Sequence, residues 1–254
     1  EPLPGVMPPL KSSVPAVASK LTTGEVEGVK VASMTTGSPV TTVALVVSGG
    51  SSVESAATAG ASKVLEAMAF KATKDRTTFR VTRELEKIGA IAYAQAGRES
   101  VTFAIDAVSL NTPEATEILL DTVLNPRMQY HEVRDNVANV KTELAKALAN
   151  PEYALTETLH RVAYDGSLGQ PLMADPASLS LSHTDMQAFH ASLMQPGNLM
   201  LAGIGADHAE ITGLASPMLS ESLTSCGAAP AAAKSTYVGG SANVVASSPL
   251  THVA

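Results

Sequence analysis

The sequence is poor in the residues that build disulfide frameworks and thiolate metal clusters. It contains one cysteine, Cys226, in 254 residues. A single thiol cannot form an intrachain disulfide or supply the several sulfur ligands of a structural zinc cluster. Cys226 lies among alanine, serine and glycine, and we interpret it as a small side chain without a chemical role. A reducing compartment is compatible with this composition.

Long apolar runs and basic charge are also scarce. No stretch reaches the roughly 18 consecutive apolar residues of a membrane-spanning helix, since even TVALVV at 42–47 is followed by Ser48 and two glycines. The chain carries 17 basic and 24 acidic side chains, a net charge of −7. That balance disfavours nucleic acid and is compatible with basic peptides or basic partner surfaces. We therefore expect no nucleic-acid partner and no transmembrane segment, with membrane association only through partner proteins.

Familiar catalytic motifs are missing as well. The sequence holds no G-x-S-x-G nucleophile elbow and no G-x-x-x-x-G-K-[ST] phosphate loop. Its 6 histidines include no pair four residues apart, the spacing that places two ligands on one helix face. His183 and His190 lie seven residues apart, and we interpret them as a solvated pair rather than a metal site.

The sequence does contain enough apolar residues, 45%, to form a packed core. Residues 1–20 are proline-rich and predict an extended N-terminal arm. Residues 21–222 predict one folded domain, 223–236 a linker of small residues, and 237–254 the start of a truncated or missing second domain. That last stretch could alternatively be an arm docked on a partner. The opening EPLPGVMPPLK has neither an apolar signal core nor an Arg-rich segment, so we expect a mature form or an excised piece.

Alternating and helical patterns together predict an α+β fold. β-branched and apolar runs predict strands at 29–34, 41–50 and 198–206, with a hairpin over 91–109. Helical periodicity predicts helices at 55–71, 78–88, 112–124, 130–149, 151–164, 183–194 and from about 207. This order of elements predicts a mainly antiparallel sheet with helices packed on one face.

The first predicted helix carries an unusual arrangement around an acid. GASKVLEAMAFKATKDRT, residues 60–77, places Glu66 between Lys63 and Ala67. Lys63 and Ala67 are four residues apart, the spacing at which a peptidase helix carries two zinc-binding histidines around its acid. The acid is present and the histidines are not. Further along the chain come TFRVTRELEKIGA, AGRESVTFAIDAV, NVKTELAKA, GSLGQPLMA and YVGG.

In the order and spacing of these segments the chain resembles the inverted zinc metallopeptidases of the pitrilysin type. The resemblance extends from about Leu21 to the last residue. It is nearest to the subunits of mitochondrial processing peptidases and to the related core proteins of ubiquinol–cytochrome c reductase, respiratory complex III. Such proteins have two homologous halves, so the resemblance implies one half of a two-domain subunit. The glycine-rich loop that alpha-type subunits offer to presequences belongs to the second half and is absent from this sequence.

The resemblance also implies where a metal site would lie. Catalytic members read H-x-x-E-H, with a further glutamate that completes the zinc ligands. By position the first histidine falls on Lys63, the general base on Glu66, the second histidine on Ala67 and the distal ligand on Glu143. A zinc hydrolase needs three protein ligands and an open position, and a protonated lysine repels the ion. We therefore expect no catalytic residue, no cofactor and no metal, with Glu66 and Glu143 remaining as hydrogen-bonding or salt-bridging acids near Lys63.

The hairpin and the acidic residues leave alternatives open. Arg98 and Glu99 lie in the turn of the predicted hairpin, where they form either a solvated turn or part of an interface or substrate edge. Glu66, Glu99, Asp106 and Glu143 are candidates for an acidic cavity that attracts basic presequence peptides.

Loss of both histidines places the chain on the non-catalytic side of the family. The main interpretation is a core-2-like structural subunit of complex III, peripheral on the matrix side of the mitochondrial inner membrane. Its expected partners are a core-1 or beta-type subunit and other complex III subunits. The alternative is a presequence-recognising alpha subunit of the processing peptidase.

Overall fold

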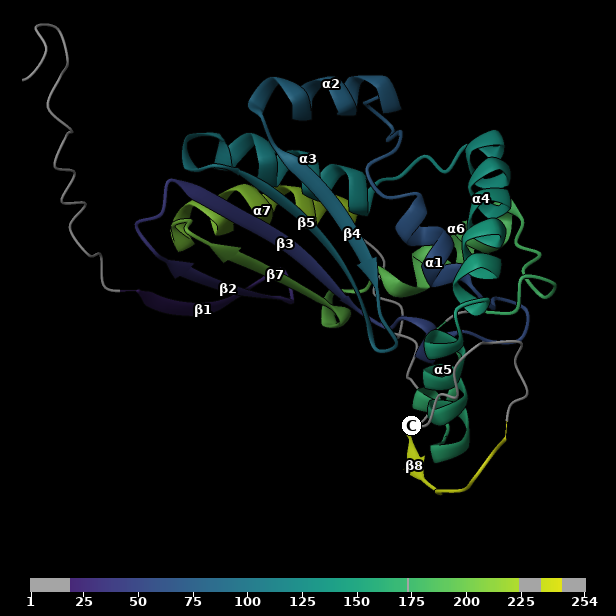
Figure 1. The fold of residues 1–254 in the computed structure, drawn as a ribbon. Helices are drawn as coiled ribbons and strands as arrows, with labels where there is room; N and C mark the ends of the chain where they lie inside the picture. The colour runs from purple at the N-terminus through teal and green to yellow at the C-terminus, as the bar shows by residue number, and fades with distance from the viewer. Residues whose placement is uncertain (1–18, 173, 224–233, 244–254) are drawn as a thin grey trace, which may run out of the picture.

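The computed structural model describes residues 19–172, 174–223 and 234–243. Most of the expected arm at 1–20, most of the expected linker at 223–236 and the end of the 237–254 stretch lie outside them, as does Cys226. The domain boundaries therefore stay predictions. Within the described residues the chain forms an α+β fold, and this predicted class is confirmed (Figure 1).

Six strands form one mixed sheet in the order β1-β2-β7-β3-β5-β4. Neighbouring strands are antiparallel except for β2 and β7, which confirms the predicted, mainly antiparallel sheet. The edge strand β1 had no counterpart among the predicted strands, because its sequence KLTTGEV is largely polar and exposed. The bounds are β1 Lys20–Val26, β2 Val29–Thr35, β3 Val40–Ser48, β4 Ile91–Ala96, β5 Ser100–Val108 and β7 Leu199–Ile204.

Strand β7 lies between β2 and β3, although those two are close neighbours in the sequence. Leu199 and Leu201 point to the buried side of the sheet, with Gly203 as the next residue on that side. A β-carbon on Gly203 would overlap the side chain of Ile211, which belongs to the helix α7 (His208–Ser222) packed on this side of the sheet. The glycine therefore permits this helix to approach the centre of the sheet closely.

Helices cover one face of the sheet, as predicted. The helices α3 (Thr112–Leu124) and α7 (His208–Ser222) lie along this face, with α2 (Thr78–Ile88) beyond α3 (Figure 1). Val43, Leu45 and Val47 of β3 point toward them and are fully buried, while the residues between them are only partly buried. This alternation follows from the two-residue period of a strand, which sends successive side chains to opposite faces.

A second group of helices stands at one end of the sheet (Figure 1). It comprises α1 (Ala61–Ala67), α4 (Tyr130–Leu148), α5 (Pro151–Ala163) and α6 (His183–Leu193). The helices from α2 to α6 begin and end within one residue of their predicted bounds. Gly89 ends α2 in a left-handed conformation, as expected of a glycine at a helix C-terminus.

The first helix is much shorter than the predicted span of 55–71. Gly60 has a φ of +82° immediately before α1, and Phe70 has a φ of +57° after it, so neither can continue a right-handed helix. The carboxylate of Glu54 accepts the backbone N–H groups of Gly60 and Ser62 at 2.7 and 2.8 Å. These bonds satisfy amides at the start of α1 that have no partner within the helix. Burial raises the pKa of Glu54, against the hydrogen bonds from Ser62 and Gly60.

A short segment near the C-terminus packs on the same unit. Strand β8 (Thr236–Tyr237) pairs with β6 (Tyr164–Asp165), directly after α5. The rings of Tyr164 and Tyr237 meet edge to face with centroids 5.7 Å apart. None of the described helices has the length and apolar content needed to cross a membrane.

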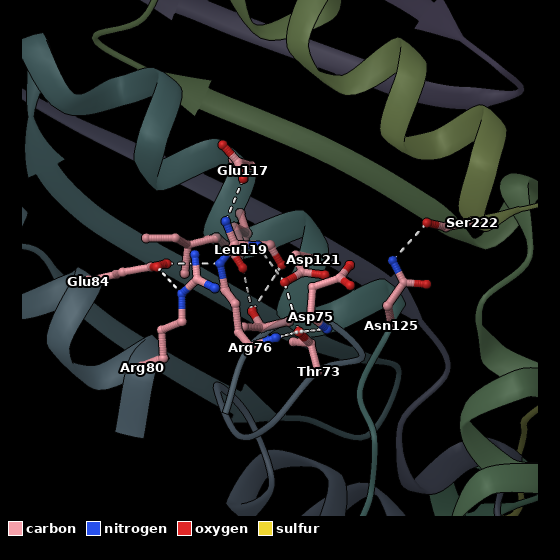
Figure 2. Close-up of polar contacts among 12 residues, drawn as sticks. Thr73, Asp75, Arg76, Arg80, Glu84, Glu117, Leu119, Asp121, Asn125 and Ser222 are labelled. Atoms are coloured by element: carbon pink, nitrogen blue, oxygen red, sulfur yellow. Dashed lines mark hydrogen bonds and ion pairs between the residues drawn. The ribbon is translucent and has the colours of Figure 1, made fainter. Parts of the chain in front are cut away.

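Arg76 joins the loop after α1 to α2 and α3 (Figure 2). Its guanidinium contacts Asp121 at 2.6 Å, Glu84 at 2.8 Å and Glu117 at 2.5 Å. Thr73, in the same loop, donates to Asp121 at 3.0 Å. Burial opposes the charge of Arg76, but hydrogen bonds to Glu117, Asp121 and Glu84 raise its pKa. Asp121 is buried, and Arg76 and Thr73 supply the hydrogen bonds to its carboxylate.

His190 joins α6 to α3 and is not half of a solvated pair. Its Nε2 lies 2.7 Å from the carbonyl oxygen of Val123, and its side chain is buried with Met186, Phe189 and Leu193 of α6. The prediction for His190 was wrong because the seven-residue spacing from His183 does not show which side of the helix faces the core. Burial lowers the pKa of His190, against the hydrogen bond to Val123.

Replacing Arg76 should destabilise the fold strongly. Arg76→Met leaves Asp121 buried without its cation, and we expect the free energy of unfolding in urea to fall by about 3 kcal/mol. Arg134→Met is the control, because Arg134 and Asp135 are 66% and 60% exposed. That change should cost less than about 0.5 kcal/mol. Equal losses in the two variants would contradict the role assigned to Arg76.

The buried His190 should make stability depend on pH. Its native pKa is lowered, so its contribution is present above the unfolded-state pKa of about 6.5 and is lost as pH falls toward the native value. Between about pH 7.5 and pH 5.5, we expect the wild type to lose about 1 kcal/mol more unfolding free energy than His190→Gln. His183→Gln serves as the control and should follow the wild type. The assignment fails if His190→Gln shows the full wild-type pH dependence.

Candidate functional site

The four positions implied by the metallopeptidase resemblance lie around one cavity. This cavity has a volume of about 480 Å³ and lies between α1, β4 and α4. Lys63, Glu66 and Ala67 line it from α1, and Glu143 lines it from α4. Residues far apart in the sequence are therefore brought together as the resemblance implied.

Glu66 forms ionic and hydrogen-bonding contacts within the protein. Its Oε2 lies 2.8 Å from Nζ of Lys63 on the same helix. The same oxygen accepts the backbone N–H of Ala96, the last residue of β4, at 2.7 Å. The Lys63 and Glu66 side chains are 19% and 27% exposed, so water screens this pair only in part. Glu66 thus links α1 to the end of the sheet's edge strand.

The residues of the cavity do not fit a catalytic zinc ion. Glu66 is engaged by Lys63, the side chain of Ala67 has no donor atom, and the ammonium of Lys63 occupies a ligand position with positive charge. In the part of the chain that the structure describes, no cluster of three or more His, Cys, Asp or Glu side chains is arranged to hold a metal. A hydrolytic zinc site requires three protein ligands, and this cavity offers two carboxylates, one of them already paired.

Helix α4 supplies the polar wall of the cavity. Asn136, Asn139 and Glu143 all line it, at spacings of three, four and seven residues that keep them on one side of a helix. The side-chain amide of Asn136 donates to the carbonyl of Glu132 at 2.8 Å, which leaves its own oxygen as an acceptor. The two asparagines were not among the predicted site residues. Their helical spacing from Glu143 was the signal that could have found them.

The edge of β4 borders the cavity. Strand β4 is the last in the sheet, and Ala94 lines the cavity. Since Ala96 donates its N–H to Glu66 rather than to β5, its backbone faces the open edge. Alternate residues of a strand share this direction, so Ala94 also presents its backbone groups at that edge.

The predicted acidic set does not gather in the cavity. Only Glu66 and Glu143 line it. Asp106 accepts a hydrogen bond from Thr42 at 2.6 Å on the opposite face of the sheet, and Glu99 is exposed in the hairpin turn. The prediction grouped these residues by charge alone. The alternation of side chains along β5 directs Asp106 to the opposite face of the sheet, and Glu99 lies in the exposed turn.

Arg98 is not part of a solvated turn. Its guanidinium pairs with Glu157 of α5 at 2.7 Å, and the two side chains are 12% and 11% exposed. Arg98 also donates to the carbonyl of Gln170 at 3.0 Å, while Glu157 accepts the N–H of Leu172 at 2.9 Å. The turn is therefore tied to α5 and to the following loop. An interface or substrate-edge role for Arg98 and Glu99 stays a prediction.

Tyr153 on α5 lies within electrostatic range of these groups. Burial raises the pKa of its hydroxyl, the carboxylates of Glu157 and Glu66 raise it further, and Arg98 acts in the opposite direction. Helix α5 thus places Tyr153 and Glu157 near Glu66 of α1 and Arg98 of the hairpin turn.

Comparison with known proteins agrees with this geometry. The chain is 36% identical to the probable mitochondrial-processing peptidase subunit alpha-1 of Arabidopsis thaliana, over 100% of this chain and 50% of the relative. It is 34% identical to the mitochondrial-processing peptidase subunit alpha of Solanum tuberosum, over 100% of this chain and 48% of the relative. It is 26% identical to cytochrome b-c1 complex subunit 2 of Rattus norvegicus, over 98% of this chain and 56% of the relative.

The chain spans about half the length of these curated relatives. Residues 30–176 match the family model described as Insulinase (Peptidase family M16). That match covers more than half of the chain and includes α1, β4 and the cavity-lining part of α4. The resemblance inferred from the sequence is confirmed: the chain belongs to peptidase family M16.

Proposed function

We propose that this chain is a non-catalytic, alpha-type subunit of a mitochondrial processing peptidase, which binds basic presequence peptides for a beta-type catalytic partner. The cavity between α1, β4 and α4 is the observation that carries the proposal. The relatives at 34% and 36% identity, both alpha subunits, support this assignment over the complex III relative at 26%.

The charges in the cavity suit a cationic ligand. Lys63 neutralises Glu66, whereas Glu143 is exposed and makes no ion pair with any of the described residues. Asn136 and Asn139 line the same cavity from α4, and their side-chain amides contain carbonyl oxygens that can accept hydrogen bonds. A guanidinium or ammonium group requires such acceptors, because all of its polar hydrogens are donors.

The remaining walls suit the aliphatic part of the same side chain. Ala67, Ala94, Val140, Leu144 and Ala147 line the cavity with apolar atoms. Arginine and lysine carry a hydrocarbon stem below the charge, which packs on apolar surface while the head group meets acceptors. The open edge of β4 supplies backbone groups that an extended peptide can pair with. The cavity thus offers a basic peptide a counter-ion, an apolar wall and a strand edge.

The loss of the metal positions agrees with recognition without hydrolysis. Ala67 provides no metal ligand, and Lys63 provides a cation in place of one. Glu66, at the position of the general base, is paired with Lys63 and bonded to Ala96, so it holds α1 to β4. Cleavage is assigned to the partner subunit. Sites that bind a peptide without cutting it need acceptors and shape, and they need no metal.

Glu143 should decide the affinity for basic peptides. A hydrogen bond to a charged group contributes about 1.5–3 kcal/mol, so Glu143→Gln should weaken binding of an arginine-containing presequence peptide about tenfold or more. Fluorescence anisotropy of the labelled peptide at low salt measures the affinity. A peptide with citrulline in place of arginine has nearly the same shape without the charge, and it should bind the wild type and Glu143→Gln equally.

Glu86→Gln is the matched control, since Glu86 is an exposed acid on α2 outside the cavity. It removes the same charge and should leave the affinity nearly unchanged. If Glu143→Gln and Glu86→Gln weaken binding to the same small extent, net charge alone attracts the peptide and the cavity is not the site.

A core-2-like structural subunit of complex III is the second candidate. The match to rat cytochrome b-c1 complex subunit 2 over 98% of this chain favours it. In that role the chain would be peripheral on the matrix side of the inner membrane and would pair with a core-1 or beta-type subunit.

Purification of the tagged chain from mitochondria in mild detergent should separate the two functions. We expect a beta-type processing peptidase subunit to co-purify, because the alpha-type relatives are the more similar ones. Recovery of cytochrome b in stoichiometric amounts would support the complex III role instead. A chain found with neither partner would contradict both functions.

A further inference from the structure

The cavity between α1, β4 and α4 contains a positive charge of its own. Among the described residues that line it, Lys63 is the only basic one, and Glu66 and Glu143 are the only acidic ones. One lysine and two glutamates give the lining a net charge of −1. Because Lys63 is paired with Glu66, the remaining negative charge is that of Glu143.

Space does not limit this cavity to one basic side chain. Its volume is about 480 Å³, which lies within the range of about 300–1,000 Å³ found for sites that hold a whole drug-sized ligand. A cation that leaves water for such a cavity needs a counter-ion or several hydrogen-bond acceptors. The number of basic side chains that the cavity accepts therefore depends on the number of free carboxylates.

Glu66 could serve a ligand if Lys63 did not hold it. Its contacts with Nζ of Lys63, at 2.8 Å, and with the N–H of Ala96, at 2.7 Å, both end on Oε2. The other carboxylate oxygen, Oε1, can accept a further donor. The side chain of Glu66 lines the cavity and is 27% exposed. Without the ammonium of Lys63, Glu66 would thus be a second counter-ion for a bound cation.

The stability of α1 does not account for this ion pair. Lys63 lies near the start of the helix and Glu66 near its end, which is the less favourable order for a pair of this spacing and for the helix dipole. The bond from the Ala96 N–H to Glu66 does not require Lys63. Lys63 therefore contributes little to the fold through this pair, and its main consequence is the charge available in the cavity.

We propose that Lys63 is a specificity-determining residue, whose ammonium competes with the ligand for Glu66 and limits the cavity to one basic side chain, held by Glu143. The inference rests on the proposed function, because it takes basic peptides as the ligand. A second arginine of the peptide would have to displace Lys63 from Glu66, which would leave two cations beside one carboxylate. A second arginine therefore gains no counter-ion in this cavity.

A series of peptides tests this limit on the wild type. Each diarginine peptide carries its second arginine one, two or three positions after the first, and its reference peptide has citrulline at the second position. Fluorescence anisotropy gives the ratio of the two affinities at about 0.15 M salt, where the Debye length of about 8 Å reduces long-range attraction. The wild type should bind each diarginine peptide within about threefold of its reference peptide.

Lys63→Met should change this ratio. It removes the ammonium and keeps an unbranched apolar side chain, so Glu66 becomes a free carboxylate. The diarginine peptide of the best spacing should then bind about tenfold or more tightly than its reference peptide. Lys63→Arg keeps the charge and should keep the wild-type ratio. Lys87→Met removes an exposed lysine of α2 outside the cavity, and it should also keep the wild-type ratio.

A double variant shows whether the gain depends on Glu66. Glu66→Gln combined with Lys63→Met removes the carboxylate but keeps an oxygen that can accept the N–H of Ala96. The preference for the diarginine peptide should disappear in this variant. The Tm of Lys63→Met should lie within about 2 °C of the wild-type value, because a pair of this spacing contributes little to stability. The change in the ratio then reports on the cavity and not on unfolding.

Three results would overturn the role of Lys63: a wild type that already prefers a diarginine peptide about tenfold, an unchanged ratio in Lys63→Met, or a gain that persists in the double variant. If the ratio is unchanged in Lys63→Met while Glu143→Gln weakens binding of the reference peptide, the proposed function stands without this inference. A gain in Lys63→Met without any effect of Glu143→Gln supports the role of Lys63 and contradicts that of Glu143. Binding of neither peptide to any variant contradicts both.

Discussion

The pairing of β7 with both β2 and β3 is the constraint on which the rest of the sheet depends. It inserts residues from late in the chain between two strands that follow one another early in the sequence. Because strand side chains alternate, this register sets both faces at once. Leu199 and Leu201 complete the core under α7, and Ala202 lies on the other side of the sheet. A shift of one residue would send the leucines to the side of the sheet that faces away from the helices.

The pair of Lys63 and Glu66 has a comparable role at the cavity. Glu66 is held near the end of β4 by its bond to Ala96, and a carboxylate in that position needs a nearby positive charge or other donors. In a zinc peptidase the metal supplies the positive charge. Here Lys63 supplies it from the same helix, one turn away. Without histidines at residues 63 and 67, α1 is still anchored to the sheet through Glu66, beside the cavity between α1 and α4.

Sequence reasoning predicted the elements with strong local signals and missed those that depend on distant contacts. The helices from α2 to α6 were predicted closely, because capping residues and periodicity act within a few residues. The end of α1 depends on the left-handed conformation of Phe70, and the polar strand β1 exists through its pairing with β2. The largely buried position of Arg98 depends on Glu157, and the buried position of His190 depends on Val123; both partners are far away in the sequence.

The positions of the candidate site were found from the family motif in the sequence. The contacts that determine its chemistry were found from the structure. Lys63, Glu66, Ala67 and Glu143 could be placed together from the motif alone. The asparagines of α4, the bond from Ala96 and the scattering of Asp106 and Glu99 required the coordinates. Charge type in a sequence says nothing about the direction in which a strand points each side chain.

The edge strand β4 connects the cavity to the sheet. Tyr93 and Ala94 are adjacent in the sequence and therefore point to opposite sides of the sheet. Tyr93 points away from the helices α3 and α7, and Ala94 points toward the cavity. A peptide in the cavity would lie along the backbone of Ala94. Within the sheet, only β5 holds this strand. The bond from the Ala96 N–H to Glu66 also ties this strand to α1, so the edge that a peptide would use is held from two sides.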